Sequence, residues 1–263
     1  MFAYFQSPFG MQDSYILALN AGLVAGLIFQ VILLLRLKKK PAFLCYLAAY
    51  YAVMMIGRSV AAVWRGLSVG GIDSFQDVVY AAKYITGSHF SGHLFCFMIL
   101  YIPFLWLIRE FAGEIFGLDL GDTASMLNLG ELIIATLPVQ HFFNRLGCLL
   151  RGCCYGVEYD GPLSLSLPYN TSLDHCVFPC QILEMAGMIV LTVVVIFCIV
   201  KRRHFAAAIL IGFGVVFFVA EFVTDNTDAV KVFGLTLIQL LSVFFVIAGL
   251  VTARLQKKLK AEW

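Results

Sequence analysis

Residues 141–156 read HFFNRLGCLLRGCCYG, and this stretch decides how the fold and the function of the chain are interpreted. It ends a long apolar segment, so Arg145 stands where the hydrocarbon of a membrane should still surround the helix. A cation at that depth costs several kcal/mol, so it needs partners and usually has a function. The last ten residues hold three cysteines and three glycines, which marks the stretch as a candidate site.

Composition defines the class of protein. Of the 263 residues, 61% are hydrophobic and 13% are charged, whereas soluble domains are about 45–50% apolar. A soluble protein is therefore excluded, and we predict an integral membrane protein. The net charge of +2 comes with no basic patch that would indicate nucleic-acid binding. Residues 1–13 lack the basic start of a cleavable signal peptide, so we expect none.

Seven segments are long and apolar enough to cross a bilayer, which takes about 20 residues per helix. We expect these helices at residues 15–35, 43–63, 90–108, 125–147, 179–200, 205–224 and 234–251. The predicted fold class is therefore an all-α integral membrane protein with seven transmembrane helices. Residues 1–263 are expected to form a single polytopic domain.

The basic residues predict the orientation. If seven helices alternate, most of the 18 basic residues fall on one side of the membrane. They are Arg36, Lys38, Lys39, Lys40, Arg109, Lys201, Arg202, Arg203, Arg254, Lys257, Lys258 and Lys260. Because basic loops stay in the cytoplasm, we expect the N-terminus outside and the C-terminus cytoplasmic.

This orientation places ionisable side chains from five helices at one depth. They are Arg58, His93, Arg145, Glu184 and Glu221. Buried charges in a membrane pair with one another or line a watery cavity, so we predict a polar chamber that opens toward the outer leaflet. The alternative is that single residues near helix ends reach the interface and have no function.

Neighbouring residues strengthen the case for Arg145. Asn144 precedes it, and Gly147 and Gly152 follow, where the missing side chains let a ligand or another backbone approach. Glu131 lies nearer the cytoplasmic end of the same predicted helix, and we interpret it as structural.

The stretch from Arg145 to Gly156, RLGCLLRGCCYG, resembles the signature of the prolipoprotein diacylglyceryl transferase family in its cysteine-containing variant, Arg-Ile-Gly-Cys-Phe-x-x-Gly-Cys-Cys-Tyr-Gly. Other family landmarks follow in the same order along the chain. They are Gly57-Arg58, Ser91-Gly92-His93-Leu94, Pro179-Cys180-Gln181-Ile182-Leu183-Glu184, Glu221-Phe222 and Gln239-Leu240-Leu241-Ser242.

The resemblance implies a reaction, its partners and its place in the cell. The family moves a diacylglyceryl group from phosphatidylglycerol to a cysteine thiol of a secreted precursor protein, and glycerol phosphate leaves. The site would face the outer leaflet of the bacterial inner membrane, with no cofactor and no metal. Two alternatives stay open, namely a phospholipid-dependent transferase with another acceptor and a non-catalytic lipid-binding protein with the same fold.

The resemblance also assigns roles to residues. Arg145 would bind the lipid phosphate, Glu221 would be the acid of the penultimate helix, and Arg58 would be a second anion contact. The candidate catalytic residues are Arg145, Glu221, His93 and Cys148. The candidate substrate-binding residues are Arg58, Asn144, Gly147, Gly152, Gly156, Gln181 and Glu184.

Four positions depart from the family pattern. Ser91 stands where the family has its catalytic histidine, although His93 lies close by. Cys148 replaces an asparagine, Cys153 a glutamate, and Phe217 an arginine.

Five of the eight cysteines lie in or beside one predicted outer loop, and they are Cys148, Cys153, Cys154, Cys176 and Cys180. Because thiols outside the cytoplasm tend to form disulfides, we expect Cys153 or Cys154 to pair with Cys176 or Cys180. A zinc site that includes His175 and a catalytic thiol are the alternatives. Residues 157–175 cannot span the membrane and are expected to cover the chamber as a lid.

Overall fold

The computed structural model describes residues 4–7, 10–36, 51, 74, 110–111, 131, 134–166, 175–225 and 231–259. The chain divides into two units, one made of Met1–Leu37 and Leu127–Trp263 and the other of Lys38–Met126. Apart from residues 51, 74 and 110–111, the described residues belong to the first unit. The predicted helices at 43–63 and 90–108, with Arg58 and His93, lie outside the described residues.

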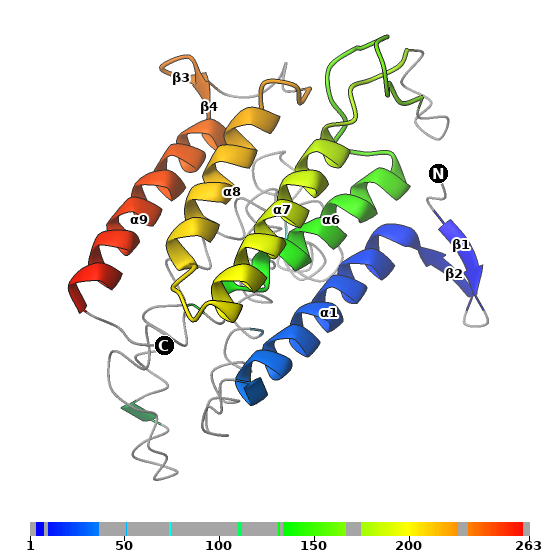
Figure 1. Ribbon diagram of the computed structural model, residues 1–263. Helices are drawn as coiled ribbons and strands as arrows, with labels where there is room; N and C mark the ends of the chain where they lie inside the picture. Colours follow the sequence, from blue (N-terminus) through cyan, green and yellow to red (C-terminus); the bar gives the residue numbers. More distant parts are fainter. Residues whose placement is uncertain are drawn as a thin grey trace. The chain divides into compact units, whose positions relative to one another are not determined.

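Five helices of the first unit pack side by side in a row, each against the next (Figure 1). In order they are α1 (Ser14–Arg36), α6 (Leu137–Arg151), α7 (Cys180–Val200), α8 (Ala206–Ala220) and α9 (Leu237–Leu259). Neighbours run antiparallel, so α6 and α8 end where α1, α7 and α9 begin. We call this end of the row the signature end, and the opposite end, where α8 begins, the Glu131 end.

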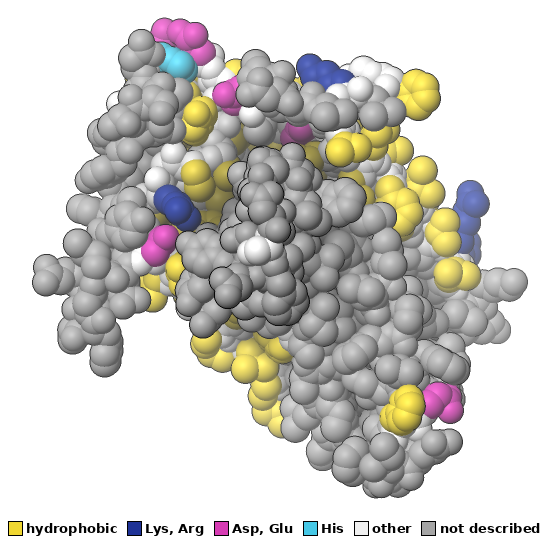
Figure 2. Space-filling model, turned by 180° about the vertical axis from the view of Figure 1, so that it is seen from behind, with side chains coloured by type: hydrophobic (Ala, Val, Ile, Leu, Met, Phe, Trp, Pro, Cys, Tyr) yellow, Lys and Arg dark blue, Asp and Glu magenta, His cyan; other side chains and the backbone are white. Residues whose placement is uncertain are grey.

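The described helices have the composition of membrane spans. Three of them contain spans by length and hydropathy, at Ser14–Leu35, Cys180–Val200 and Leu237–Lys257, and α8 is a shorter apolar helix. Large apolar side chains such as Val190 and Val193 are about 60% exposed on α7. Apolar side chains make up most of the described surface in the space-filling view (Figure 2). Exposed apolar faces of this size suit a lipid surrounding, so the chain is mostly helical and membrane-like, while the count of seven helices and their sidedness stay predictions.

The predicted helices at 15–35 and 179–200 match α1 and α7 closely, whereas α6, α8 and α9 begin or end at other residues than predicted. Helix α6 continues past Gly147 to Arg151 and stops where Gly152 adopts a left-handed φ of 75°. Helix α8 ends at Ala220, before the predicted end at residue 224. Helix α9 starts later, at Leu237, because Thr236 and Gln239 bond each other's backbone amides as a capping box, at 3.0 and 3.2 Å.

Two short antiparallel hairpins precede helices, and the all-α prediction omitted both. Strands β1 (Tyr4–Ser7) and β2 (Gly10–Asp13) lead into α1, and β3 (Lys231–Val232) and β4 (Leu235–Thr236) lead into α9. Strands of two to four residues are too short to give a readable alternation of side chains. The Asp13 carboxylate accepts the Tyr15 backbone amide at 2.8 Å and so caps α1.

Small residues bring α1 and α6 close together. A Cβ atom at Gly22 would lie 2.7 Å from Phe143 Cβ, and one at Gly26 would lie 2.7 Å from Gln140 Nε2. Farther along, a Cβ atom at Gly147 would lie 2.9 Å from the Tyr15 ring. Glycines at such positions let two membrane helices approach closely. This packing fixes the face of α6 that carries Arg145.

Candidate functional site

An arginine, a histidine and a glutamate meet at the signature end. His141 and Arg145 are four residues apart on α6, which places them on one face of the helix. Arg145 Nε donates to Glu184 Oε2 at 2.7 Å, and His141 Nε2 lies 2.8 Å from the same oxygen. Glu184 comes from the second turn of α7, so one carboxylate joins two helices.

Burial makes this cluster costly unless its charges are paired. The His141 side chain is 0% exposed and that of Glu184 3%, whereas 20% of the Arg145 side chain is exposed. A buried carboxylate without a partner costs several kcal/mol, and the contact with Arg145 offsets that cost. Two of the five ionisable residues expected at one depth, Arg145 and Glu184, are thus in direct contact.

Only Nε of Arg145 is used in this contact. Within the described part of the chain, the structure gives the Arg145 side chain no hydrogen bond other than that to Glu184. The guanidinium is thus held at Nε, while the N–H groups of its two terminal nitrogens remain available to donate hydrogen bonds to a ligand. A fixed, partly exposed guanidinium fork is suited to binding phosphate with two parallel hydrogen bonds.

Our sequence interpretation gave His141 no role. Its ring packs edge-on against two rings of α8, Phe213 and Phe217, with centroids 5.9 and 5.0 Å away. Phe217, at a position where the resemblance implies an arginine, thus packs directly on the histidine. The spacing of His141 four residues before Arg145 was the signal that could have identified it.

Other predicted site residues have contacts within the protein. Asn144 Nδ2 donates to the Tyr15 hydroxyl at 3.2 Å, and Gln181 Nε2 donates to the Cys153 carbonyl at 2.8 Å. Glu221 is buried at the end of α8, at the signature end. Gly147 packs on α1 and Gly152 ends α6. Their roles toward a substrate stay predictions.

Gly156 lies at a crossing of three chain segments. Its backbone amide donates to Phe178 O at 3.0 Å, and the Val157 amide donates to Val223 O at 3.0 Å. A Cβ atom at Gly156 would lie 2.3 Å from Val223 O and 2.6 Å from Phe178 O. No side chain fits there, so glycine is required for the turn after α6 to reach the start of α7 and the end of α8.

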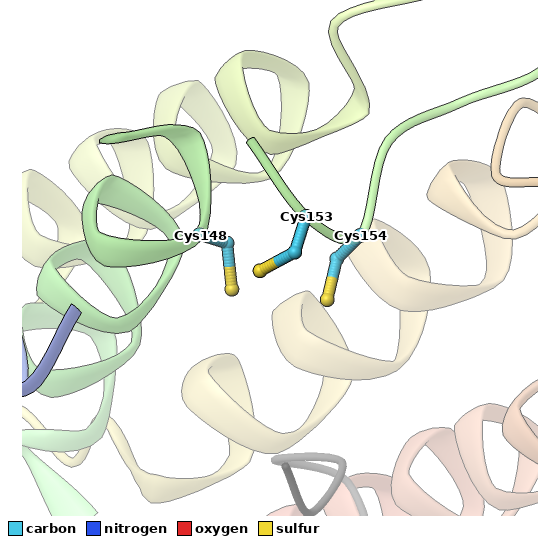
Figure 3. A group of neighbouring side chains, drawn as sticks. All are labelled: Cys148, Cys153 and Cys154. Atoms are coloured by element: carbon cyan, nitrogen blue, oxygen red, sulfur yellow. The ribbon is translucent and has the colours of Figure 1, made fainter. Parts of the chain in front are cut away.

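Three thiols gather beside this crossing. The sulfur atoms of Cys148, Cys153 and Cys154 lie within 4.8 Å of one another (Figure 3). Their order along the chain explains the cluster, since Cys148 is in the last turn of α6 and the other two follow Gly152 directly. The hydrogen bond with Cys148 lowers the pKa of the Cys153 thiol, but the bond with Cys154, burial and the charge of Cys154 outweigh it and raise that pKa to about 11.

The predicted disulfides are wrong for the described residues. Among these residues, cysteines 148, 153, 154, 176, 180 and 198 form no disulfide. Cys180 Sγ donates to the Cys154 carbonyl at 3.0 Å, while the Cys153 side chain extends toward Cys148 and the Cys154 sulfur lies nearby. The prediction placed the partners across the loop, whereas the turn at Gly152 brings together thiols that are close in sequence.

Glu131 occupies the other end of the row, as a structural residue. Its carboxylate accepts hydrogen bonds from the backbone amides of Phe205 and Ala206, the latter at 2.7 Å. His204 Nδ1 lies 2.7 Å away, and Gln256 Nε2 donates at 3.2 Å. Glu131 thus accepts hydrogen bonds from backbone amides at the start of α8, where the helix itself offers no acceptor, which confirms its structural interpretation.

Comparison with known proteins covers the same part of the chain. A segment of the chain is similar to the phosphatidylglycerol–prolipoprotein diacylglyceryl transferase 2 of Clostridium perfringens (strain 13 / Type A), with 36% identity over 47 residues, 18% of each chain. It is also similar to the phosphatidylglycerol–prolipoprotein diacylglyceryl transferase of Rhodopirellula baltica (strain DSM 10527 / NCIMB 13988 / SH1), with 41% identity over 46 residues. That match covers 17% of this chain and 9% of the relative, so both alignments span less than a fifth of the relatives' lengths.

A family profile covers much more of the chain than these pairwise matches do. The profile for prolipoprotein diacylglyceryl transferase matches residues 111–254, which is more than half of the sequence. These residues include α6, α7, α8 and the whole Arg145–Glu184–His141 cluster. With its signature arginine, closing glycine and paired glutamate arranged on these helices, the chain belongs to the prolipoprotein diacylglyceryl transferase family.

Proposed function

We propose that this protein transfers the diacylglyceryl group of phosphatidylglycerol to a cysteine thiol of a secreted precursor protein. The reaction would take place at the outer leaflet of the bacterial inner membrane. The names of the two relatives support the donor and the acceptor class. Family membership supports the reaction type.

One observation carries the proposal, namely the anchored guanidinium of Arg145. Its Nε is bonded to Glu184 at 2.7 Å, and the side chain is only partly buried. In the reaction, the acceptor sulfur attacks the glyceryl carbon and the bond from that carbon to the phosphate oxygen breaks. Glycerol phosphate leaves with the bonding electron pair, so negative charge grows on the leaving oxygen. A fixed guanidinium stabilises that charge without having to reorganise.

His141 and Glu184 act as positioning residues in this proposal. Glu184 is held by the buried imidazole on one side and holds Arg145 on the other. The orientation of the guanidinium plane therefore depends on a carboxylate that cannot rotate freely. A change at either residue should lower the rate by misplacing Arg145.

The test uses the purified protein in vesicles that contain phosphatidylglycerol, with a peptide whose single cysteine follows a lipobox. Mass spectrometry of the peptide should show the added diacylglyceryl group. Arg145→Ala should lower the rate by about 100-fold or more, the effect of removing a donor to developing charge. Arg145→Lys should restore little activity because an ammonium group cannot form the bidentate contact.

Arg151→Ala is the matched control. Arg151 lies on the same helix, is 39% exposed and is 3.6 Å from Asp13, away from Glu184. This variant should keep the parental rate. Transfer at the parental rate by Arg145→Ala would refute the site assignment, and lipid consumption that does not require the peptide would indicate a different acceptor.

A further inference from the structure

The three thiols at the end of α6 are placed by an uncommon backbone. Gly152 has a φ of 75° and Cys154 a φ of 56°, so the chain turns back on the last turn of α6. Residues other than glycine seldom adopt a positive φ, and when they do the conformation often belongs to a functional site. The three side chains extend to the same side of the turn, with their sulfur atoms facing a common space (Figure 3).

The distances suit one thiophilic metal ion. Zinc binds thiolate sulfur at about 2.3 Å, so two sulfurs of a tetrahedral site lie about 3.8 Å apart. The sulfurs of Cys148, Cys153 and Cys154 already lie within 4.8 Å of one another. Small side-chain rotations would close the remaining difference. The sequence prediction of no metal is untested, and the alternative zinc site combined His175 with the outer-loop cysteines.

A positive charge lies beside the cluster. Arg145 lies one helical turn before Cys148 and interacts electrostatically with both Cys148 and Cys154. Three thiolates around a divalent ion leave one net negative charge, which a neighbouring guanidinium group partly offsets.

We propose that Cys148, Cys153 and Cys154 bind one zinc ion and leave its fourth position for the thiol of the acceptor. Within the described residues, the group of metal-ligand side chains at this place contains three members. Cys148 is buried, Cys153 is half-buried and Cys154 is exposed, so an incoming thiol can reach the cluster from one side. Three protein ligands and one open position are the arrangement of catalytic zinc.

This inference rests on the proposed function and supplies the activated acceptor. A thiol that coordinates zinc loses its proton, which passes to solvent. The zinc-held thiolate then uses a sulfur lone pair to form the bond to the glyceryl carbon. The bond from that carbon to oxygen breaks, and its electron pair leaves with the phosphate that Arg145 binds. Nothing is oxidised or reduced, and the new thioether is a weaker zinc ligand that can leave.

The first test measures metal in the wild-type protein, purified without chelator. Elemental analysis should give about one zinc per chain, as expected for a single closed set of three thiolates. Site-resolved alkylation should show Cys148, Cys153 and Cys154 protected and then exposed by a chelator. Cys198, near the other end of α7, should react equally in both states. Three thiols that alkylate fully in zinc-loaded protein would overturn the proposal.

The second test uses cobalt in place of zinc. The cobalt(II) protein should show sulfur-to-metal charge transfer, and a cysteine-containing lipobox peptide should increase it while the serine version should not. Cys148→Ser and Cys153→Ser should lower metal occupancy about tenfold or more, because loss of one of three thiolates removes a large share of the affinity. Cys198→Ser should bind normally. A spectrum unchanged by the cysteine peptide, or a site that holds only copper(I), would overturn the open zinc position.

The two proposals fail in different ways. Zinc with peptide thiol bound, but no lipid transfer by any variant, would support the metal site and refute the transferase. Cysteine variants that lack zinc and still transfer lipid at the parental rate would refute the metal site and leave the transferase standing.

Discussion

Glu184 and Glu131 are both buried carboxylates, but they lie at opposite ends of the helix row and accept hydrogen bonds from different groups (Figure 1). Glu184 is bonded by the side chains of Arg145 and His141. Glu131 is bonded by two backbone amides at the start of α8, with His204 and Gln256 added from their side chains. When a carboxylate caps a helix, its oxygens accept hydrogen bonds from backbone amides, and those amides have no further role. A carboxylate that holds a cation leaves that cation's other donors for a ligand.

The strongest way to break this comparison is Glu184→Gln. The amide keeps the volume but leaves the Arg145 charge without its partner, and breaking a buried ion pair costs about 3–5 kcal/mol. We expect the free energy of unfolding in mixed micelles to fall by about that amount, and peptide lipidation to fall about 100-fold with it. A variant that is destabilised but transfers lipid at the parental rate would show that Glu184 is as structural as Glu131.

Glu131→Ala tests the other half of the comparison. Removing the carboxylate leaves two amides at the start of α8 unbonded, which costs about 1–3 kcal/mol. The free energy of unfolding should fall by that amount, while the lipidation rate per folded molecule should not change. If the rate fell more than the folded fraction, the two ends of the row would be coupled.

The smallest effect is expected for Gln256→Ala. Its bond to Glu131, at 3.2 Å, accompanies those from His204, Phe205 and Ala206, and the amide lies on the partly exposed last turns of α9. Loss of one such bond costs about 1 kcal/mol or less. The free energies of unfolding of this variant and of Glu131→Ala should be compared. Their difference would show how much of the stabilisation by Glu131 comes from its bond with the Gln256 side chain and how much from its other hydrogen bonds.

The sequence predicted the helices and the ion pair because both depend on long-range simple patterns. Apolar runs predicted α1 and α7 within a residue or two at each end. The alternation of the helices predicted that Arg145 and Glu184 lie at one depth, and in the structure the two side chains are in contact. His141 was missed because its spacing from Arg145 shows only that the two share a helix face, and not that both contact one carboxylate of α7.

The turn after α6 could not be predicted in the same way. Cysteine spacing alone does not show which thiols converge, since that depends on the left-handed backbone at Gly152 and Cys154. An exposed outer loop favoured disulfides on general grounds. The local turn instead directs two thiols toward Cys148, and the carbonyl of Cys154 accepts the Cys180 thiol.

The crossing at Gly156 also sets an order for assembly in the membrane. The turn after α6 is complete only when Gly156 bonds Phe178 and Val157 bonds Val223, and Val223 follows the last residue of α8. Because the ribosome delivers the chain from its N-terminus, α6 and α7 enter the membrane before that partner exists. We therefore expect the thiol cluster to stay open during synthesis, accessible to metal delivery or oxidation, until α8 is inserted. Arrested chains that end before α8 should alkylate at Cys153 and Cys154 much faster than the finished protein.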